Sequence, residues 1–300
     1  MKFSYVFCFK LEVQGREKMA LNGKKKITLT DEMILRYSRQ IILDEVGGEG
    51  QKKLLSASVF IAGTGGLGAP AALYLAAAGV GKIAVADFDK VDLSNLQRQI
   101  IYSTEDVGKP KALVSAEKLK KLNPDIEVVA INEKISASNV IDLIKDYDIV
   151  LDGSDNFSAR YAVSDACVIL GKPYVYGSVL RFEGQVSTFV PSAEGPCYRC
   201  LYPEPPPPGV MPSCQEAGVL GVVPGIIGLL QANEVLKLIL GKGQPLIGKL
   251  LVFDALTTEF SVFKVRKRKD CPACGENPVI KTPQDIEEWC SVPSQSGGNL

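Results

Sequence analysis

The chain has 300 residues, of which 46% are hydrophobic and 23% are charged, and its 34 basic side chains balance 34 acidic ones. These values are ordinary for a globular protein, and the balanced charge gives no support for binding nucleic acid or anionic membranes through bulk charge. The chain contains no histidine, which excludes Ser-His-Asp and Cys-His catalysis, histidine-ligated metals and imidazole acid–base chemistry.

No segment provides the roughly 20 apolar residues that a transmembrane helix needs. The longest apolar run, 217–230, contains Pro224 and is followed by polar residues, which favours a buried helix. The apolar stretch 3–9 is too short for a signal peptide. We therefore expect a cytoplasmic protein, in which thiols stay reduced and paired cysteines indicate a metal site before a disulfide.

Residues 1–30 are predicted to be a peripheral extension, in which Met19 is an alternative start, and a helix is predicted over 31–43 with Thr30 or Asp31 as its N-cap. From residue 58 onward, short apolar strands alternate with helices. Strands are predicted at 59–62, 82–87, 126–131 and 149–152, and helices up to 78 and at 110–122, 138–145 and 156–170. This alternation predicts a Rossmann-like α/β fold, with a parallel sheet covered on both faces.

The second half of the sequence predicts a continuation into a mixed sheet. Strands are expected at 174–179, 185–190, 250–253 and 260–265, with a turn near 183–184, a proline-rich loop at 203–212 and a helix from about 216 to 240. We expect one domain over 31–276, followed by a loose tail over 277–300.

A glycine-rich turn, 63–68, fits the pattern G-x-G-x-x-G between a predicted strand and a predicted helix. The first glycine permits a tight turn, the second lets a phosphate approach the backbone, and the third packs the helix against the strand. The free N–H groups of the helix N-terminus also favour an anion. The turn therefore predicts a phosphate site, but it does not distinguish ATP from a dinucleotide, and Asp87 at the end of the second strand suits a ribose hydroxyl in either case.

The polar segment 91–99 favours ATP over a dinucleotide. It offers Asn95 and Arg98, together with Lys111, to a triphosphate lying across the strand ends. The fourth strand delivers the run 152–156, in which a carboxylate would hold Mg²⁺ and offset phosphate charge. An NAD(P)-dependent oxidoreductase and a non-catalytic nucleotide-binding scaffold remain the alternatives.

Several motifs together resemble the ThiF/MoeB/HesA family, relatives of ubiquitin-activating enzymes. The matching stretches run from about residue 35 to 275 and are 36–40 (Arg-Tyr-Ser-Arg-Gln), 63–68, 94–98, Lys111, 155–156, 196–200 and 218 onward. The resemblance implies an adenylyltransferase that uses ATP to activate the C-terminal glycine carboxylate of a small ubiquitin-like sulfur-carrier protein, with release of pyrophosphate. It also implies a homodimer. Because only about 26 residues follow Cys274, we expect a separate sulfur donor, a cysteine desulfurase or a rhodanese.

The resemblance also implies roles for individual residues. Gly66, Asn95, Arg98 and Lys111 would meet the phosphates, Asp87 the ribose and Asp155 the Mg²⁺ ion, while Arg39 would reach into the site of the partner subunit. Without the resemblance, Arg36 and Arg39 would be interpreted as a solvated helix face. The full set of expected nucleotide-binding residues is Gly63, Gly65, Gly66, Gly68, Asp87, Ser94, Asn95, Leu96, Gln97, Arg98, Lys111, Asp155 and Asn156. The expected catalytic residues are Arg39, Arg98, Lys111, Asp155 and Cys214.

This set of side chains suits the implied reaction. A C-terminal carboxylate is already ionised at neutral pH, so that its attack on the α-phosphorus of ATP requires no strong base. The difficulty is that an anion must approach a polyanion, and arginine, lysine, Mg²⁺ and backbone amides lower that barrier. The absence of histidine is therefore compatible with adenylyl transfer.

Four cysteines form two C-x-x-C pairs, Cys197 with Cys200 and Cys271 with Cys274, separated by the 70 residues 201–270. Two such pairs fit a tetrahedral structural Zn²⁺ site, and the resemblance strengthens this interpretation. A redox dithiol is the alternative, but it lacks a thioredoxin-like context.

Of the other cysteines, Cys214 precedes the predicted helix at 216–240, where a thiol can have a lowered pKa. A covalent link to the carrier and an unreactive side chain both remain open for it. Cys167 is expected in the core, and Cys8 and Cys290 as ordinary residues. The sequence also leaves the carrier open, among a molybdopterin-synthase small subunit, a thiamine sulfur carrier, and a modifier attached to other proteins or used in tRNA thiolation.

Overall fold

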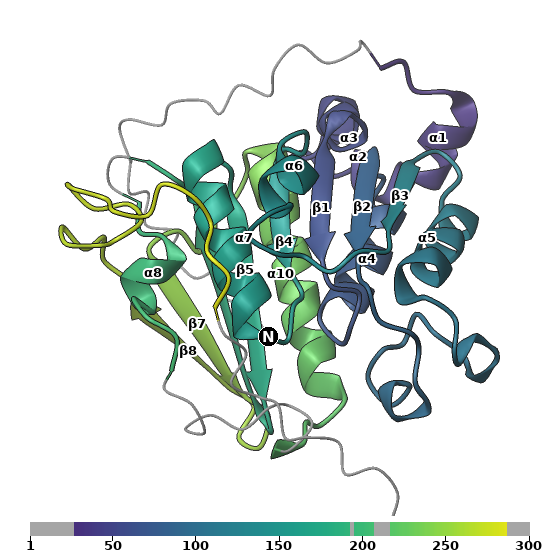
Figure 1. The fold of residues 1–300 in the computed structure, drawn as a ribbon. Coiled ribbons are helices and arrows are strands. Elements are labelled where there is room, and N and C mark those ends of the chain that lie inside the picture. Colours follow the sequence, from purple (N-terminus) through teal and green to yellow (C-terminus); the bar gives the residue numbers. More distant parts are fainter. Residues whose placement is uncertain (1–26, 193–194, 207–216, 287–300) are drawn as a thin grey trace, which may run out of the picture.

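The computed structural model describes residues 27–192, 195–206 and 217–286. Their strands form one eight-stranded sheet in the order β3-β2-β1-β4-β5-β6-β7-β8 (Figure 1). The strands are β1 (Ser58–Ala62), β2 (Lys82–Ala86), β3 (Glu127–Ile131), β4 (Ile149–Asp152), β5 (Tyr174–Leu180), β6 (Glu183–Phe189), β7 (Lys249–Asp254) and β8 (Glu259–Lys264). The strands from β3 to β5 pair in parallel and those from β5 to β8 pair antiparallel. The predicted Rossmann-like parallel sheet with a mixed continuation is confirmed.

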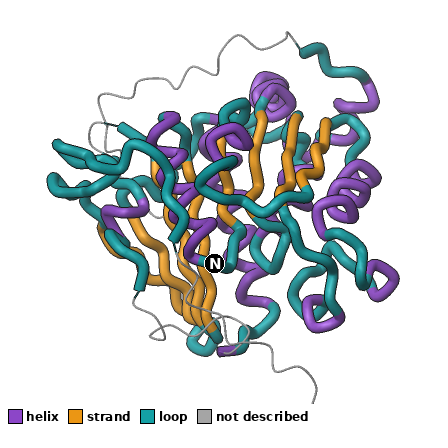
Figure 2. The backbone as a smooth tube through the Cα atoms, in the orientation of Figure 1, coloured by secondary structure: helices purple, strands orange, loops and turns teal. Residues whose placement is uncertain are grey.

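Helices cover both faces of the parallel half (Figure 2). One face packs against α3 (Gly47–Ser56), α4 (Gly68–Ala77), α5 (Lys111–Leu122) and α10 (Val222–Leu240), and the other against α6 (Val140–Ile144) and α7 (Phe157–Leu170). Alternate residues of β1 divide between the two cores, with Val59 and Ile61 on the α4 side and Phe60 and Ala62 on the α7 side. Because both faces are buried, the strand is apolar throughout instead of alternating.

The single helix predicted over 31–43 is wrong. The chain forms α1 (Asp31–Arg36), with Thr30 as its N-cap, and α2 (Ser38–Ile41), and the two are separated at Tyr37. The Tyr37 ring is buried, and its hydroxyl donates to Asp125 (3.2 Å) and accepts from Asn123 (2.9 Å). We infer that these tertiary bonds hold the chain in the turn that interrupts the helix.

The turn between β5 and β6 lies at Arg181–Phe182, two residues before the predicted position, since Leu180 already pairs with Glu183. Gly184 had suggested the turn, but it lies within β6, where its lack of a side chain lets α10 pack closely against the sheet. A Cβ atom at Gly184 would lie 2.3 Å from the Ile227 side chain of α10. The glycine therefore allows α10 to lie directly on the sheet.

The helix predicted from about 216 begins at Val222, and residue 216 itself lies outside the described residues. Before it, Val219 forms a bridge with Arg181, which keeps the chain extended. α10 is long and apolar enough to cross a membrane by length and composition, but half of it is buried in the described chain. It packs against α4, β5 and β6, as expected for the predicted core helix.

Candidate active site

The site lies where the strand order reverses, at the carboxyl ends of β1 and β4, which is the place where doubly wound sheets bind ligands. The glycine-rich turn occupies this place, between β1 and α4. Gly63 has a φ of +87°, and a Cβ atom there would lie 2.8 Å from the carbonyl oxygen of Gly153 after β4. A Cβ atom at Gly68 would lie 1.9 Å from the carbonyl oxygen of Gly63. These two positions therefore require glycine, because the backbones of the turn, the helix and the loop after β4 are in direct contact there.

Asp87, at the end of β2, fixes the conformation of the turn. One of its carboxylate oxygens accepts from the Thr64 N–H (2.9 Å) and hydroxyl (3.2 Å), and the other accepts from the Asp89 N–H (3.0 Å). Burial raises the pKa of the Asp87 carboxyl, while the ammonium of Lys111 and the bond from Thr64 oppose that rise. The carboxylate thus already holds the protein backbone in the described structure, in addition to any contact with a ribose.

Lys111 begins α5 and directs its ammonium to the same edge of the sheet. The side chain is only 7% exposed, and Nζ lies 3.1 Å from the half-exposed carboxylate of Asp89. A buried lysine beside a single partly exposed carboxylate can exchange that partner for a phosphate with little change in its own burial. The position is suited to an anionic ligand.

The segment after β2 forms a short 3₁₀ turn, Leu93–Asn95, capped reciprocally by Asp92 and Asn95. The side-chain amide oxygen (Oδ1) of Asn95 accepts from the Asp92 N–H (3.1 Å). Arg98 follows, and its guanidinium donates to the Ser94 carbonyl oxygen (3.0 Å). Its Cγ lies 3.5 Å from the place of a Cβ atom on Gly66, so the arginine stem lies against the glycine-rich turn.

The run 152–156 contains two carboxylates in different environments. Asp152 is fully buried and bonds to Ser154, to Arg160 (3.1 Å) and to the Tyr174 hydroxyl (2.6 Å). Asp155 is exposed, and among the described residues nothing bonds its carboxylate. Of these two carboxylates, Asp155 is therefore the one available to a metal ion. Asn156 caps α7 by accepting from the Ala159 N–H (2.8 Å), which is a structural role.

The structure brings most of the predicted residues together at this edge but not Arg39. Arg39 lies on α2, whose Gln40 donates to the carbonyl oxygen of Ala78 at the far end of α4 (3.2 Å). α4 begins at the glycine-rich turn and is about 15 Å long, so Arg39 lies at the opposite edge of its own chain. Arg36 pairs with Asp125 (3.1 Å), whereas Arg39 is exposed. Cys214, Cys8 and Cys290 lie outside the described residues.

Two buried glutamines near the site were missed from the sequence. Gln99 is 4% exposed, its Oε1 has no partner within the described ranges, and its Nε2 lies 3.5 Å from the place of a Cβ atom on Gly65. Gln231 of α10 donates to the carbonyl oxygens of Asp152 (2.6 Å) and Val175 (3.2 Å), which ties α10 to the ends of β4 and β5. Gln99 directly follows Arg98 in the polar segment, which was the available signal. Gln231 is one of several polar residues in the second half of an apolar helix, and nothing in its spacing indicated a contact with the ends of β4 and β5.

The four cysteines of the two C-x-x-C pairs converge, although 70 residues separate the pairs. Their sulfur atoms lie within 4.8 Å of one another, with Cys197 to Cys271 at 3.5 Å and Cys200 to Cys274 at 3.4 Å. A tetrahedral site with Zn–S bonds of about 2.3 Å places its sulfurs about 3.8 Å apart, so the cluster fits that ion. Hydrogen bonds among the four thiols lower the pKa of Cys200 and Cys271 and raise the pKa of Cys197 and Cys274.

The cysteine cluster is anchored to α7, the helix that follows Asp155. Arg199, inside the first C-x-x-C pair, forms a two-pronged ion pair with Asp165 of α7 (2.7 and 2.8 Å). The neighbouring Tyr198 packs edge-on against Tyr161 of the same helix, with ring centroids 5.1 Å apart. The cluster therefore joins the segment after β8 to the helical layer of the parallel half.

Comparison with known proteins gives a consistent result. The ThiF family model matches residues 37–273. The chain is 49% identical to the sulfur carrier protein adenylyltransferase of Thermus thermophilus, over 88% of this chain and 98% of that protein. It is also 49% identical to the SAMP-activating enzyme E1 of Haloferax volcanii, over 86% of this chain and 95% of that protein. The crystal structure of E. coli MccB with ATP superposes with a TM-score of 0.68 at 27% identity, covering 80% of this chain and 74% of that one.

Proposed function

The chain belongs to the ThiF family, and from this premise we propose that it is an ATP-dependent adenylyltransferase acting on the C-terminal carboxylate of a small ubiquitin-like sulfur-carrier protein. The observation that carries the proposal is the convergence of the glycine-rich turn, Arg98, Lys111 and the exposed carboxylate of Asp155 at one edge of the sheet. The related MccB structure contains ATP, which supports ATP over NAD(P) as the nucleotide.

In the proposed reaction, a carboxylate oxygen of the carrier attacks the α-phosphorus of ATP. A bond forms between that oxygen and the phosphorus, the bond to the β-phosphate oxygen breaks, and pyrophosphate leaves with the electron pair. No proton has to be removed from the attacking group, because a C-terminal carboxylate is ionised at neutral pH. Catalysis therefore depends on charge neutralisation and alignment.

Each residue at the edge has a place in this scheme. Arg98 and Lys111 neutralise the phosphates as negative charge moves to pyrophosphate, and the N–H groups of the glycine-rich turn bind a phosphate at the start of α4. Asp87 keeps that turn in shape and binds the ribose. Asp155 would hold Mg²⁺, which supplies further neutralisation of the phosphates when bound.

We place Arg39 in the active site of a second copy of the chain. Its exposure on α2, at the edge opposite its own glycine-rich turn, supports a role in trans over one in cis. A homodimer related by a two-fold axis would exchange the two arginines equally. Dimerisation also remains a proposal.

The remaining parts of the proposal concern zinc, sulfur and place in the cell. Zn²⁺ held by the four cysteines would be structural, because four sulfur ligands leave no open position for catalysis. Cys214 is a proposed covalent acceptor of the activated carrier. The sulfur would come from a separate cysteine desulfurase or rhodanese, and the reactions would take place in the cytoplasm.

The decisive experiment is ATP–pyrophosphate exchange with purified zinc-loaded protein, Mg²⁺ and a panel of small proteins ending in Gly-Gly. Exchange that depends on one carrier would establish the reaction and name the partner. We expect Lys111→Ala to lower the exchange rate at least about 10²-fold. Lys120→Ala, which removes an exposed lysine from the same helix, is the matched control and should leave the rate unchanged. No exchange with any carrier would overturn the proposal.

A further inference from the structure

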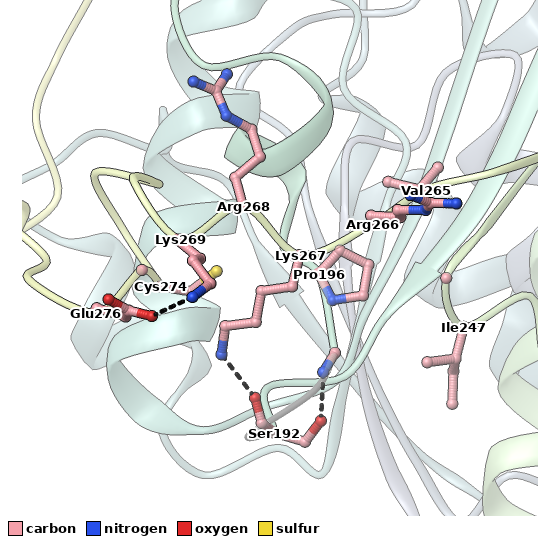
Figure 3. A pocket seen from close by; sticks show the side chains of 13 residues that line it. Ser192, Pro196, Ile247, Val265, Arg266, Lys267, Arg268, Lys269, Cys274 and Glu276 are labelled. Atoms are coloured by element: carbon pink, nitrogen blue, oxygen red, sulfur yellow. Dashed lines mark hydrogen bonds and ion pairs between the residues drawn. The ribbon is translucent and has the colours of Figure 1, made fainter.

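A second concave site lies at the opposite edge of the sheet from the glycine-rich turn. Its lining comes from three parts of the chain, which are Ser192, Gly195 and Pro196 after β6, Ile247 and Gly248 before β7, and residues 265–269 and 274–276 after β8 (Figure 3). It is an open depression with a volume of about 900 Å³. β6 runs about 23 Å from the edge that holds the candidate active site to this one. We call this cavity the basic groove. At that distance it cannot contribute directly to the binding of ATP at the glycine-rich turn.

The charge of the groove differs from that of the whole chain, which is neutral. Among the lining residues that the structure describes, Arg266, Lys267, Arg268 and Lys269 are basic and Glu276 is acidic. Lys269 lies 3.4 Å from Glu276, and Arg268 forms a two-pronged pair with Asp270 (3.1 and 2.7 Å). Within the described parts of the chain no carboxylate pairs with the exposed guanidinium of Arg266. The described part of the lining therefore has a net positive charge and an exposed arginine.

The groove also has an apolar wall, formed by Pro196, Ile247 and Val265. Ile247 is 40% exposed, so part of its side chain is accessible to a ligand. A small inorganic anion would make no use of this wall. Single-stranded nucleic acid binds through aromatic stacking platforms in addition to basic residues, and the described lining of the groove contains no aromatic residue. A ligand that combines carboxylates with an aliphatic side chain uses both features.

The walls of the groove are fixed by internal bonds. The Val265 N–H donates to the Gly248 carbonyl oxygen (2.8 Å), and the Gly195 N–H donates to the Ser192 hydroxyl (2.8 Å). Lys267 donates to the Ser192 carbonyl oxygen (3.0 Å), an interaction drawn in Figure 3. Behind them the Arg268 N–H donates to the Cys200 sulfur (3.4 Å) of the cysteine cluster. A site held in this way costs little ordering entropy when a ligand binds.

We propose that the basic groove is a docking site for an acidic peptide segment of a partner protein, in which carboxylates pair with Arg266 and a neighbouring aliphatic side chain packs on Ile247 and Val265. This site is separate from the proposed adenylation site and does not depend on it. Docking at the far edge of the sheet leaves the carboxyl edge open, so a partner bound here and a nucleotide can be present together.

The test is fluorescence anisotropy with the full-length zinc-loaded protein and a set of fluorescein-labelled octapeptides. Each peptide contains seven glutamates and one leucine, and the leucine stands at a different position in each. We expect at least one peptide to bind with a Kd below about 1 mM, more weakly as salt is raised. Arg266→Glu should raise that Kd at least about tenfold, since it replaces attraction by repulsion. Lys120→Glu, the same charge change on α5, should alter it less than about twofold.

Other outcomes would overturn the proposal. One is that none of the peptides binds. Another is that Arg266→Glu and Lys120→Glu weaken peptide binding equally. A third is that matched peptides with glutamine in place of glutamate bind with the same affinity. Tighter binding of an octameric oligouridylate or of inorganic pyrophosphate, lost in Arg266→Glu, would assign the groove to nucleic acid or to a free anion instead. ATP–pyrophosphate exchange with saturating carrier should be unchanged in Arg266→Glu, which separates this proposal from the fate of the proposed function.

Discussion

The carboxyl edge of the parallel half and the cysteine cluster use their polar groups in different ways. At the carboxyl edge of the parallel half, backbone segments meet through glycines, and the side chains of Asp155 and Gln99 keep atoms with no partner in the described structure. Around the cysteine cluster, by contrast, Arg199 pairs with Asp165 and the four sulfurs lie against one another. Polar atoms without a hydrogen-bond partner in the protein indicate a place for a ligand. Polar atoms that are bonded within the protein indicate a contact that holds segments of the chain together. The first region is suited to chemistry and the second to holding the chain together.

The largest expected loss of stability comes from a substitution in the cysteine cluster. Cys271→Ser removes one of four proposed zinc ligands, and a structural zinc site supplies folding free energy directly. We expect bound zinc to fall from one per chain to below about one tenth and the free energy of unfolding to fall by more than about 5 kcal/mol. Metal analysis of the purified protein and thermal unfolding would measure both.

Cys167→Ala is the matched control for the cysteine variant. Cys167 is fully buried in the core on the α7 side and lies outside the cluster. It should lose some stability through the small cavity that it leaves, but it should keep its zinc. Equal zinc content in Cys271→Ser and the wild-type protein would show that the four sulfurs do not hold a metal together.

Asp152 and Asp155 lie close together at the end of β4 and let the structural role and the ligand-binding role be tested side by side. Asp152→Asn removes the charge that faces buried Arg160, and breaking a buried ion pair costs about 3–5 kcal/mol of stability. Asp155→Asn removes an exposed charge and should change stability by less than about 0.5 kcal/mol. Its effect should appear instead as a loss of at least about 10²-fold in pyrophosphate exchange. Urea unfolding and exchange assays on both variants would separate the two roles. A loss of stability in Asp155→Asn together with a loss of exchange alone in Asp152→Asn would show that we have assigned the two carboxylates the wrong way round.

Much of the parallel half could be predicted from the sequence, because its signals are local. The strand β1, the glycine-rich turn and helix α4 follow one another along the chain, and the turn requires glycine for reasons visible in its spacing. The resemblance then supplied the order of the polar motifs. The convergence of the cysteines was also predictable, since two C-x-x-C pairs supply the four ligands of a tetrahedral zinc site.

The errors arose where contacts between distant residues decide the local conformation. Tyr37 interrupts the predicted helix because its hydroxyl bonds to Asn123 and Asp125, which are more than eighty positions away. Gly184 was assigned to a turn because the sequence does not show that Ile227 packs over it. The helix α3 was not predicted, since three of its ten residues are glycines and its stability comes from burial of Leu54 and Leu55.

A smaller loss of stability is expected from adding a methyl group at Gly68, where the start of α4 contacts the backbone of the glycine-rich turn. Gly68→Ala places a Cβ atom 1.9 Å from the Gly63 carbonyl oxygen, so the turn or the helix must shift, at a cost of about 3 kcal/mol. Gly225→Ala is the matched control, because nothing lies within 4 Å of a Cβ atom there and α10 gains a better helix former. Chemical denaturation should show a loss in the first variant and no loss in the second. Equal stabilities would mean that the junction is less tightly packed than the structure describes.

The smallest expected change in the unmodified protein is the dependence of the exchange rate on the protonation of Asp87. Burial raises the pKa of this carboxyl, so it takes up a proton at a higher pH than an ordinary aspartate does. The ionised form accepts from the Thr64 N–H and holds the turn, whereas the protonated form is a weaker acceptor. The exchange rate should therefore be level above the raised pKa and should fall as the pH is lowered through it. Asp87→Asn is neutral at every pH, so its rate should be low throughout and should lack this acid limb. An unchanged acid limb in that variant would assign the titration to another group and would leave Asp87 a purely structural part of the edge.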